Sequence, residues 1–316
     1  MDISIIVPLL NEAESLPELQ GWIDKVMQQN NFSYETIFID DGSTDNSWEI
    51  ITKLKSEYSS VRGIKFRRNY GKSAALHTGF QASKGDVVIT MDADLQDNPE
   101  EIPGFFQMIK NDGYDLVSGW KKKRYDPFFS KNLPSKFYNW TARRISGIKL
   151  HDFNCGIKAY RKSVAKSIEI YGDMHRFIPV LAKWAGFKKI GEKVVQHQER
   201  KYGITKFGLE RFMRGPLDLM SVMFISKYGK RPLHLFGTLG TLTFIIGLFM
   251  ASIVGAFKLL ALHRHLMAPR VADSPYFYIA LTCMILGTQL FVAGFLGELV
   301  SRNSADRNKY LIEEEI

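Results

Sequence analysis

Two long uncharged runs near the carboxy-terminal end limit most strongly what this chain of 316 residues can fold into. Residues 236–257 and 276–297 are stretches of 22 residues without a single Asp, Glu, Lys or Arg. At about 1.5 Å of rise per residue, a helix of this length spans roughly 33 Å, which is enough to cross the hydrocarbon core of a bilayer. The sequence therefore predicts two transmembrane helices within residues 233–300 and excludes a freely soluble enzyme.

The remaining composition narrows the class of protein further. Hydrophobic residues make up 45% and charged residues 24% of the chain, which excludes a disordered or collagen-like protein. Cys155 and Cys283 are the two cysteines, too few for a disulfide framework or a four-cysteine zinc site. The amino terminus lacks the basic region of a signal peptide. We therefore expect a cytoplasmic domain in residues 1–206, followed by a membrane anchor.

The first 120 residues alternate between short β-rich runs and amphipathic stretches of helical length. This alternation is typical of an α/β fold with a mostly parallel sheet and helices on both faces. The predicted strands cover residues 3–9, 35–40, 62–67, 86–91 and 115–119, and the predicted helices cover residues 15–29, 46–58, 72–83 and 99–110. Ser15, Asp45 and Asn98 are the predicted helix caps.

Polar residues follow four of the predicted strands. Such sheets bind their ligands beyond the carboxyl ends of the strands, so these positions are the candidates for a site. They comprise residues 8–12 after the first strand, 40–45 after the second, 67–72 after the third, and 92–96 after the fourth. We expect these side chains to meet at one edge of the sheet.

The segment after the fourth strand carries the strongest candidate for a metal site. Asp92 and Asp94 place two carboxylates at positions i and i+2, and the amide of Gln96 follows two residues later. Oxygen ligands at this spacing suit Mg²⁺ or Mn²⁺. A structural interpretation is also open, because acids are common after strands and Asn98 and Pro99 form a good helix start.

Two neighbouring segments also have both a structural and a functional interpretation. Asp40 and Asp41 end a hydrophobic strand, where adjacent acids repel one another and cost stability without a ligand. Asp45, three residues after the glycine that follows them, is typical of a turn and helix cap. The turn at residues 69–72 either simply joins a strand to a helix or places Lys72 near a diphosphate.

Basic residues are concentrated beside the predicted spans. Residues 121–149 carry nine Lys or Arg and one acid, and residues 200–231 carry eight Lys or Arg and two acids among bulky apolar residues. Such a segment directly before a span predicts amphipathic helices in the membrane interface at residues 207–232. Six flanking cations against three in the connecting loop favour both termini, including the tail 301–316, in the cytoplasm. Anionic lipid explains this charge better than nucleic acid does.

Six motifs, in this order along the chain, resemble the successive blocks of family 2 glycosyltransferases. They occupy residues 7–12, 39–45, 68–72, 91–97, 152–156 and 200–207. Within that family the chain is most similar to the polyprenyl-phosphate glycosyltransferases, which include dolichol-phosphate mannose synthase and bacterial O-antigen-glucosylating enzymes with two carboxy-terminal spans. The resemblance covers essentially the whole chain and implies a GT-A type catalytic domain, Rossmann-like with a mostly parallel sheet.

The resemblance also implies roles for individual positions. The donor nucleotide is held by Pro8, Glu12, Asp41, Lys72 and Asp92, and Mg²⁺ or Mn²⁺ is coordinated by Asp92, Asp94 and Gln96. The acceptor phosphate is contacted by basic residues that correspond to Arg124, Arg200 and Lys206, and Asp152 is a candidate for orienting or contacting the sugar. Residues 120–124 depart from the arginine-rich, glycine-containing form of the family, which leaves open which of their cations touches the phosphate.

Together these roles predict an inverting, metal-dependent transfer of a sugar from a nucleotide sugar to a polyprenyl phosphate. A lipid phosphate is already anionic at neutral pH and does not strictly need a general base. The resemblance favours UDP-glucose and undecaprenyl phosphate at the cytoplasmic face of the bacterial inner membrane, leaves UDP-linked amino sugars and GDP-mannose open, and implies a homotetramer.

Two other functions are compatible with parts of this sequence. A processive polysaccharide synthase of the same fold usually carries a Gln-x-x-Arg-Trp motif and more spans, whereas residues 196–201 do not match that motif. A non-catalytic scaffold or lipid translocator is disfavoured by the intact motif at Asp92, Asp94 and Gln96. Neither span centre carries an ionisable residue of the kind that marks a transport path.

Overall fold

The computed structural model describes residues 1–122, 143–144, 146–196, 198, 201, 232–265, 270–303 and 312–315. The chain divides into two compact units, which are Met1–Val222 with Arg307–Ile316, and Met223–Asp306. The amphipathic helices predicted at residues 207–232 lie outside the described residues, except for Pro232.

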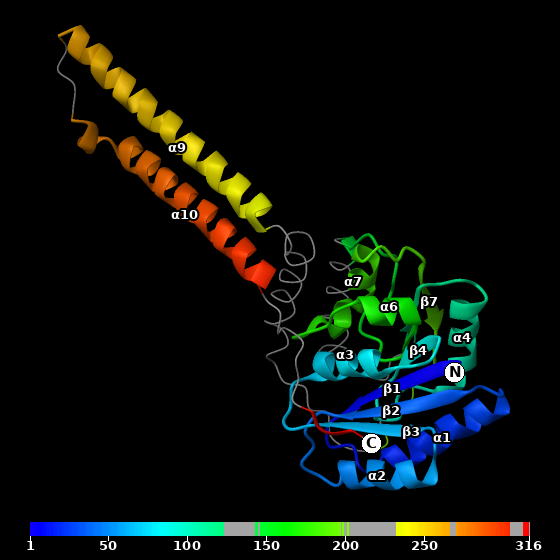
Figure 1. Ribbon diagram of the computed structural model, residues 1–316. Coiled ribbons are helices and arrows are strands. Elements are labelled where there is room, and N and C mark those ends of the chain that lie inside the picture. The colour runs from blue at the N-terminus through cyan, green and yellow to red at the C-terminus, as the bar shows by residue number, and fades with distance from the viewer. Residues whose placement is uncertain are drawn as a thin grey trace. The chain divides into compact units, whose positions relative to one another are not determined.

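An eight-stranded sheet in the order β7-β5-β6-β4-β1-β2-β3-β8 forms the centre of the first unit (Figure 1). The strands are β1 (Ile3–Leu9), β2 (Tyr34–Asp40), β3 (Val61–Phe66), β4 (Val87–Thr90), β5 (Leu116–Trp120), β6 (Lys158–Arg161), β7 (Ile190–Val194) and β8 (Ile312–Glu315). The helices of this unit are α1 (Leu16–Gln29), α2 (Ser47–Glu57), α3 (Lys72–Ala82), η1 (Pro99–Glu101), α4 (Ile102–Lys110), α6 (Lys162–Ser167), η3 (Met174–Phe177) and α7 (Ile178–Trp184).

The five predicted strands and four predicted helices of the first 120 residues are confirmed, with boundaries that differ by no more than three residues. β4, β1, β2 and β3 pair in parallel, as do β5 and β7. The sheet is nevertheless mixed, because β6 inserts antiparallel between β4 and β5, and β8 pairs antiparallel with β3. The predicted parallel core therefore accounts for the half of the sheet around β1.

The three predicted caps have different outcomes. The Asn98 side chain accepts a hydrogen bond from the backbone N–H of Glu100 at 2.8 Å, which confirms the start of η1. Ser15 is the residue before α1, but its hydroxyl donates to the carbonyl of Glu12 and so does not cap the helix. The expectation for Asp45 was wrong by one position, because Asn46 precedes α2 and Asp45 accepts from the N–H of the first helical residue.

Side chains of β1 alternate between two cores, as a strand covered on both faces requires. Ile3, Ile5 and Val7 belong to the core that also contains the buried apolar residues of α1, α2 and α4. Ile6 faces the opposite side, where α3 covers the sheet so closely that a Cβ at Gly79 would lie 2.4 Å from Ile6 Cγ2. Figure 1 shows the sheet between α1 and α2 on one side and α3 on the other.

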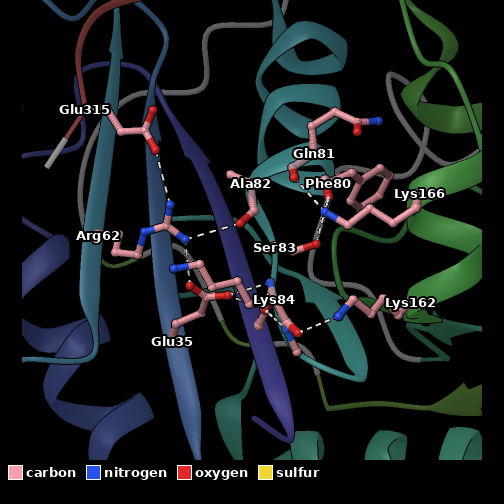
Figure 2. Close-up of polar contacts among 12 residues, drawn as sticks. Glu35, Arg62, Phe80, Gln81, Ala82, Ser83, Lys84, Lys162, Lys166 and Glu315 are labelled. Carbon is pink, nitrogen blue, oxygen red and sulfur yellow. Dashed lines mark hydrogen bonds and ion pairs between the residues drawn. The ribbon is translucent and has the colours of Figure 1, made fainter.

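The carboxyl end of α3 is fixed by cations at the amino edge of the sheet (Figure 2). Lys166 Nζ donates to the carbonyls of Phe80 and Gln81 at 2.7 and 2.6 Å, and Arg62 Nη1 donates to the carbonyl of Ala82 at 3.2 Å. These carbonyls lack partners within the helix, and positive charge is favourable at this end of the helix dipole. The amino end of α3, which begins at Lys72, therefore keeps a fixed position at the other edge of the sheet.

The acidic tail forms β8, a strand that was not predicted from the sequence. β8 pairs antiparallel with β3, so that Ile64 lies opposite Glu315 and Phe66 lies opposite Ile312. The carboxylate of Glu315 forms an ion pair with Arg62 at 3.2 Å, and Arg62 also pairs with the buried Glu35 at 2.8 Å (Figure 2). Edge strands expose unpaired backbone groups, and β8 covers those of β3.

The second unit contains the two predicted spans. α9 (Pro232–His263) and α10 (Pro275–Asn303) are helices. A stretch of 18 residues within Pro232–His263 has a mean hydropathy of 2.2, and one within Pro275–Gly297 has a mean hydropathy of 2.0. Both are long and apolar enough to cross a membrane. The two helices pack closely where glycines face each other, since a Cβ at Gly240 would lie 2.5 Å from the carbonyl oxygen of Gly287.

Candidate active site

The loops after β1 and β2 are joined by side-chain hydrogen bonds at the carboxyl edge of the sheet. Asn11, which has a positive φ of 54°, accepts through its side-chain oxygen from the N–H of Thr44 at 2.7 Å, and Ser43 Oγ accepts from the N–H of Asn11 at 2.9 Å. The N–H of Glu12 donates to Ser47 Oγ at 3.1 Å. The predicted nucleotide-binding segments 8–12 and 40–45 are therefore neighbours in the fold.

Asp41 joins the second of these loops to the third. Its two carboxylate oxygens accept from the N–H groups of Tyr70 and Gly71 at 2.7 and 2.9 Å. Burial raises the pKa of Asp41 more than these two hydrogen bonds lower it. Asp40 is fully buried and accepts from the N–H of Ser43 at 2.8 Å. Both acids thus have protein partners, which supports a role in ordering the loops.

Lys72 and Asp92 are brought together from two different strand ends. Lys72 is the first residue of α3, Asp92 follows β4, and the Lys72 ammonium contacts Asp92 Oδ1. Burial would raise the pKa of the Asp92 carboxyl, but Lys72, together with Lys121 and Lys158, lowers it to about 2. Asp92 therefore carries a negative charge at neutral pH and lies in a positively charged environment.

Asp94 and Gln96 lie on a tight turn after Asp92. The N–H of Gln96 donates to Asp94 Oδ1 at 3.2 Å, and Leu95 between them has a positive φ of 60°, which is uncommon for a residue with a branched side chain. Leu95 is buried, and such backbone strain occurs frequently at functional sites. The backbone of Gln96 also accepts a hydrogen bond from the N–H of Gln198 at 3.1 Å.

Asp97 holds the backbone of Asp92 in place. Its Oδ2 accepts from the N–H of Asp92 at 3.2 Å, and its Oδ1 forms an ion pair with Lys121 at 2.9 Å. Both acids pack against Gly156, where an added Cβ would lie 2.4 Å from Asp92 Oδ2 and 2.7 Å from Asp97 Oδ2. Gly156 therefore leaves room for the two carboxylates.

The donor set after β4 fits a hard divalent cation bound together with a substrate. Two carboxylates, Asp92 and Asp94, and the amide oxygen of Gln96 are the oxygen ligands that such cations prefer. Among the described residues no group of three or more His, Cys, Asp or Glu side chains forms a complete metal cage. A cation held here depends on oxygens from a ligand such as a diphosphate for the rest of its coordination sphere.

Two lysines near Asp92, the half-buried Lys121 and the buried Lys158, have structural partners. Lys121 was one of the cations left open as contacts of the acceptor phosphate, and Lys158 was not assigned a role from the sequence. Lys121 belongs to the basic segment 121–149, and in the structure it points inward to Asp97. Lys158 is buried on β6, and its ammonium donates to the carbonyl of Cys155. Burial lowers the pKa of Lys158, although Cys155 and Asp152 oppose this shift. A single charge within the apolar run 155–160 was the available signal for Lys158.

Asp152 and His175 complete the described part of this region. Asp152 is buried, and its carboxylate accepts from the N–H of Asn154 at 3.0 Å. His175 lies against Ser73, the second residue of α3, with 3.1 Å between His175 Nδ1 and Ser73 Oγ. Burial, followed by the charge of Lys72, holds the pKa of His175 well below its usual range. The pairing of Ser73 with His175 spans 102 residues and has no local sequence signal.

Of the remaining predicted site residues, Pro8 is described by the structure and three cations are not. Pro8 lies in β1 opposite Ile39 of β2 and is half-buried. Arg124, Arg200 and Lys206, the predicted contacts of the acceptor phosphate, lie outside the described residues.

Relatives of the chain were identified by sequence. The model of glycosyl transferase family 2 matches residues 4–169. A dodecaprenyl-phosphate galacturonate synthase from Rhizobium johnstonii is 34% identical over 96% of this chain and 88% of the relative. An undecaprenyl-phosphate 4-deoxy-4-formamido-L-arabinose transferase from Aeromonas hydrophila subsp. hydrophila is 35% identical over 99% of this chain and 93% of the relative.

Solved structures resemble the fold. Glucosyl-3-phosphoglycerate synthase from Mycobacterium tuberculosis, in complex with Mn²⁺ and UDP-glucose, superposes with a TM-score of 0.54 at 19% identity, over 71% of this chain and 78% of that structure. This likeness confirms the GT-A type fold that the motifs predicted. Because the family model covers more than half of the chain and the two relatives span nearly all of it, this chain is a glycosyltransferase that belongs to glycosyl transferase family 2.

Proposed function

We propose that this chain transfers a sugar from a nucleotide sugar to a polyprenyl phosphate at a membrane surface. The observation that carries the proposal is the group of Asp92, Lys72 and Lys121 at the carboxyl edge of the sheet, in a chain that also has two helices of membrane-spanning length. Both relatives are named for a polyprenyl phosphate, which supports this class of acceptor.

The proposed reaction is a direct displacement. A phosphate oxygen of the acceptor attacks the anomeric carbon of the sugar, a new carbon–oxygen bond forms, and the bond to the nucleoside diphosphate breaks. The diphosphate leaves with the electron pair of the broken bond. Because the phosphate oxygen attacks from the side opposite the leaving group, the anomeric centre is inverted. Because the acceptor is already an anion, the protein has to reduce charge repulsion and align the two substrates, and a general base is unnecessary.

Different residues are proposed to contact the leaving group, the acceptor and the sugar. The Lys72 ammonium at the start of α3 offers positive charge to the diphosphate, and Asp41 holds the adjacent loop in place. Asp92, Asp94 and Gln96 would hold Mg²⁺ or Mn²⁺, which neutralises charge on the leaving group when bound. We assign Arg124, Arg200 and Lys206 to the acceptor phosphate, Pro8 and Glu12 to the nucleoside, and Asp152 to the orientation of the sugar.

The proposed donor is a UDP-sugar. The resemblance to O-antigen-glucosylating enzymes favoured glucose, whereas the two relatives are named for galacturonate and for 4-deoxy-4-formamido-L-arabinose. We therefore rank these two sugars before glucose as donors to be tested. Undecaprenyl phosphate remains the proposed acceptor.

We also propose that α9 and α10 are both membrane spans and that the catalytic domain and both termini are cytoplasmic. A polyprenyl chain is retained in the bilayer by about 0.8 kcal/mol for each buried methylene, so its phosphate has to be reached at the membrane surface. The cations that flank the two spans favour this orientation. A homotetramer, implied by the family resemblance, is part of the same proposal.

A transfer assay tests the proposed function directly. Membranes that contain the full-length protein are incubated with undecaprenyl phosphate, Mg²⁺ or Mn²⁺, and radiolabelled UDP-glucose, UDP-galacturonate or UDP-4-deoxy-4-formamido-L-arabinose. We expect label from one donor to enter an organic-extractable lipid that mild acid cleaves. Asp94→Ala should abolish this labelling, whereas the exposed-site control Lys110→Met should retain it. Label in a polymer, or none from any nucleotide sugar, would reject the proposal.

A further inference from the structure

The contact between Lys72 and Asp92 occupies an oxygen that a metal ion needs. Asp92 has two carboxylate oxygens, and Oδ2 packs against Gly156, where an added Cβ would lie only 2.4 Å away. The other oxygen, Oδ1, is the one that the Lys72 ammonium contacts. A divalent cation that approaches Asp92 from its open side therefore meets an oxygen that already has a positively charged partner.

Two more cations strengthen this effect. Lys121 pairs with Asp97, whose Oδ2 accepts from the N–H of Asp92 at 3.2 Å, and the Lys158 ammonium lies on the carbonyl next to Gly156, which packs against Asp92. Lys121 is held by its ion pair with Asp97, and Lys158 is buried with its ammonium on a backbone carbonyl. These two lysines have fixed partners in the fold. Lys72 differs, because about a third of its side chain is exposed, as is about a third of the side chain of Asp92.

We propose that Lys72 and the divalent cation compete for Asp92, and that the diphosphate of the nucleotide resolves this competition by becoming the new partner of Lys72. This inference rests on the proposed function, because it assumes that a nucleoside diphosphate binds at this edge of the sheet. Its consequence is that metal and nucleotide bind cooperatively: each removes a cost that the other would otherwise meet alone. Lys72 is then a residue that couples the two ligands.

Replacement of Lys72 by a neutral residue removes both its competition with the metal ion and its contact with the diphosphate. In Lys72→Met the competing charge is gone, so Mn²⁺ alone should bind more tightly than it binds to the wild type. The expected gain lies in the range of about 5- to 150-fold that is typical of coupling between two ligands. The increase in Mn²⁺ affinity caused by UDP should be smaller in the same variant, because there is no ammonium group at residue 72 for the diphosphate to draw away from Asp92.

The experiment is a titration of the detergent-solubilised full chain with Mn²⁺, followed by the electron paramagnetic resonance signal of the free ion, with and without UDP. Lys72→Arg keeps the charge and should behave like the wild type, and Lys110→Met removes a lysine that pairs with Asp86 and should also leave binding unchanged. Asp92→Asn in the Lys72→Met background should remove the gain, which shows that the ion binds at Asp92.

Two results would overturn the inference. One is that Lys72→Met binds Mn²⁺ alone no more tightly than the wild type. The other is that the enhancement by UDP is the same in both proteins. These outcomes are independent of the transfer assay: an active wild type with an unchanged Lys72→Met titration refutes the coupling alone, whereas an inactive wild type with tighter Mn²⁺ binding in Lys72→Met refutes the proposed reaction alone.

Discussion

A single methyl group at Gly156 should disable the site without disrupting the fold. Gly156 precedes β6, and a Cβ at this position would lie 2.4 Å from Asp92 Oδ2 and 2.6 Å from Asp92 Cγ. Ordinary van der Waals contact begins at 3.4 Å, so the carboxylate of Asp92 has to move by about 1 Å. Such a displacement of a group that positions substrate costs roughly a hundredfold in rate.

The assay for Gly156→Ala is the rate of sugar transfer to lipid at saturating metal and donor, together with the thermal unfolding midpoint. Gly21→Ala is the matched control, because Gly21 lies inside α1 and an added Cβ has no neighbour within 4 Å. The control should keep the wild-type rate and unfold at the same or a higher temperature, since alanine favours a helix over glycine by about 1 kcal/mol.

The two variants together distinguish a local from a general effect. A large loss of rate in Gly156→Ala at a nearly unchanged unfolding midpoint is the expected result. Transfer by Gly156→Ala at the wild-type rate, with the wild-type requirement for metal, would refute the assignment of Asp92 to the site.

Three further outcomes are expected. Arg62→Met leaves the buried Glu35 carboxylate without its cation and should lower the free energy of unfolding by about 3–5 kcal/mol near neutral pH, whereas Glu315→Gln at the exposed pair should change it by less than about 1 kcal/mol, as measured by urea unfolding. Burial raises the pKa of Glu35, but its hydrogen-bond partners and Arg62 lower it below 4.5. The stabilisation is therefore present above pH 4.5 and is lost as the pH falls through the folded-state pKa, so the difference in free energy of unfolding between Arg62→Met and the wild type should become smaller in acid. Because burial lowers the pKa of His175 below 6.5, the folded protein loses stability as the pH falls below 6.5, and His175→Asn should lose less of its thermal midpoint between about pH 7.5 and about pH 5.5 than the wild type.

The central part of the sheet could be predicted because its signals are local. β1 and β2 are largely apolar runs bounded by polar turns, and β3 is a six-residue run in which buried residues are interrupted by the half-buried Arg62 and Lys65. The parallel register follows from the helices between the strands. The polar residues of the site come directly after those strands, so their position at the carboxyl edge followed from the fold class. Lys72 and Asp92 could therefore each be expected at this edge, whereas the contact between them was not predicted.

The antiparallel strands depend on contacts between distant residues and could not be predicted in this way. β6 is four residues long and contains Lys158 and Arg161, so its pattern is not that of an apolar strand. β8 contains three consecutive glutamates, which are poor strand formers, and Arg62, about 250 residues earlier, forms an ion pair with one of them. Such strands are stabilised by partners that the local sequence does not contain.

Two acids with cationic partners lie at opposite edges of the same sheet, and their surroundings differ. Glu35 at the amino edge accepts from Ser4 Oγ at 2.6 Å, from the N–H of Lys84 at 2.7 Å and from Arg62 at 2.8 Å, and its side chain is only 3% exposed (Figure 2). A buried carboxylate with three fixed donors cannot exchange its partners without a large loss of folding free energy.

Asp92 at the carboxyl edge has the opposite character. Its side chain is 32% exposed and that of its partner Lys72 is 36% exposed, so water and ligands reach both members of the pair. An ion pair in such a setting contributes little to stability and can be replaced by another charged group. The sheet thus places a permanent ion pair at one edge and an exchangeable one at the other, and the exchangeable pair is the one that a nucleotide and its metal ion can use.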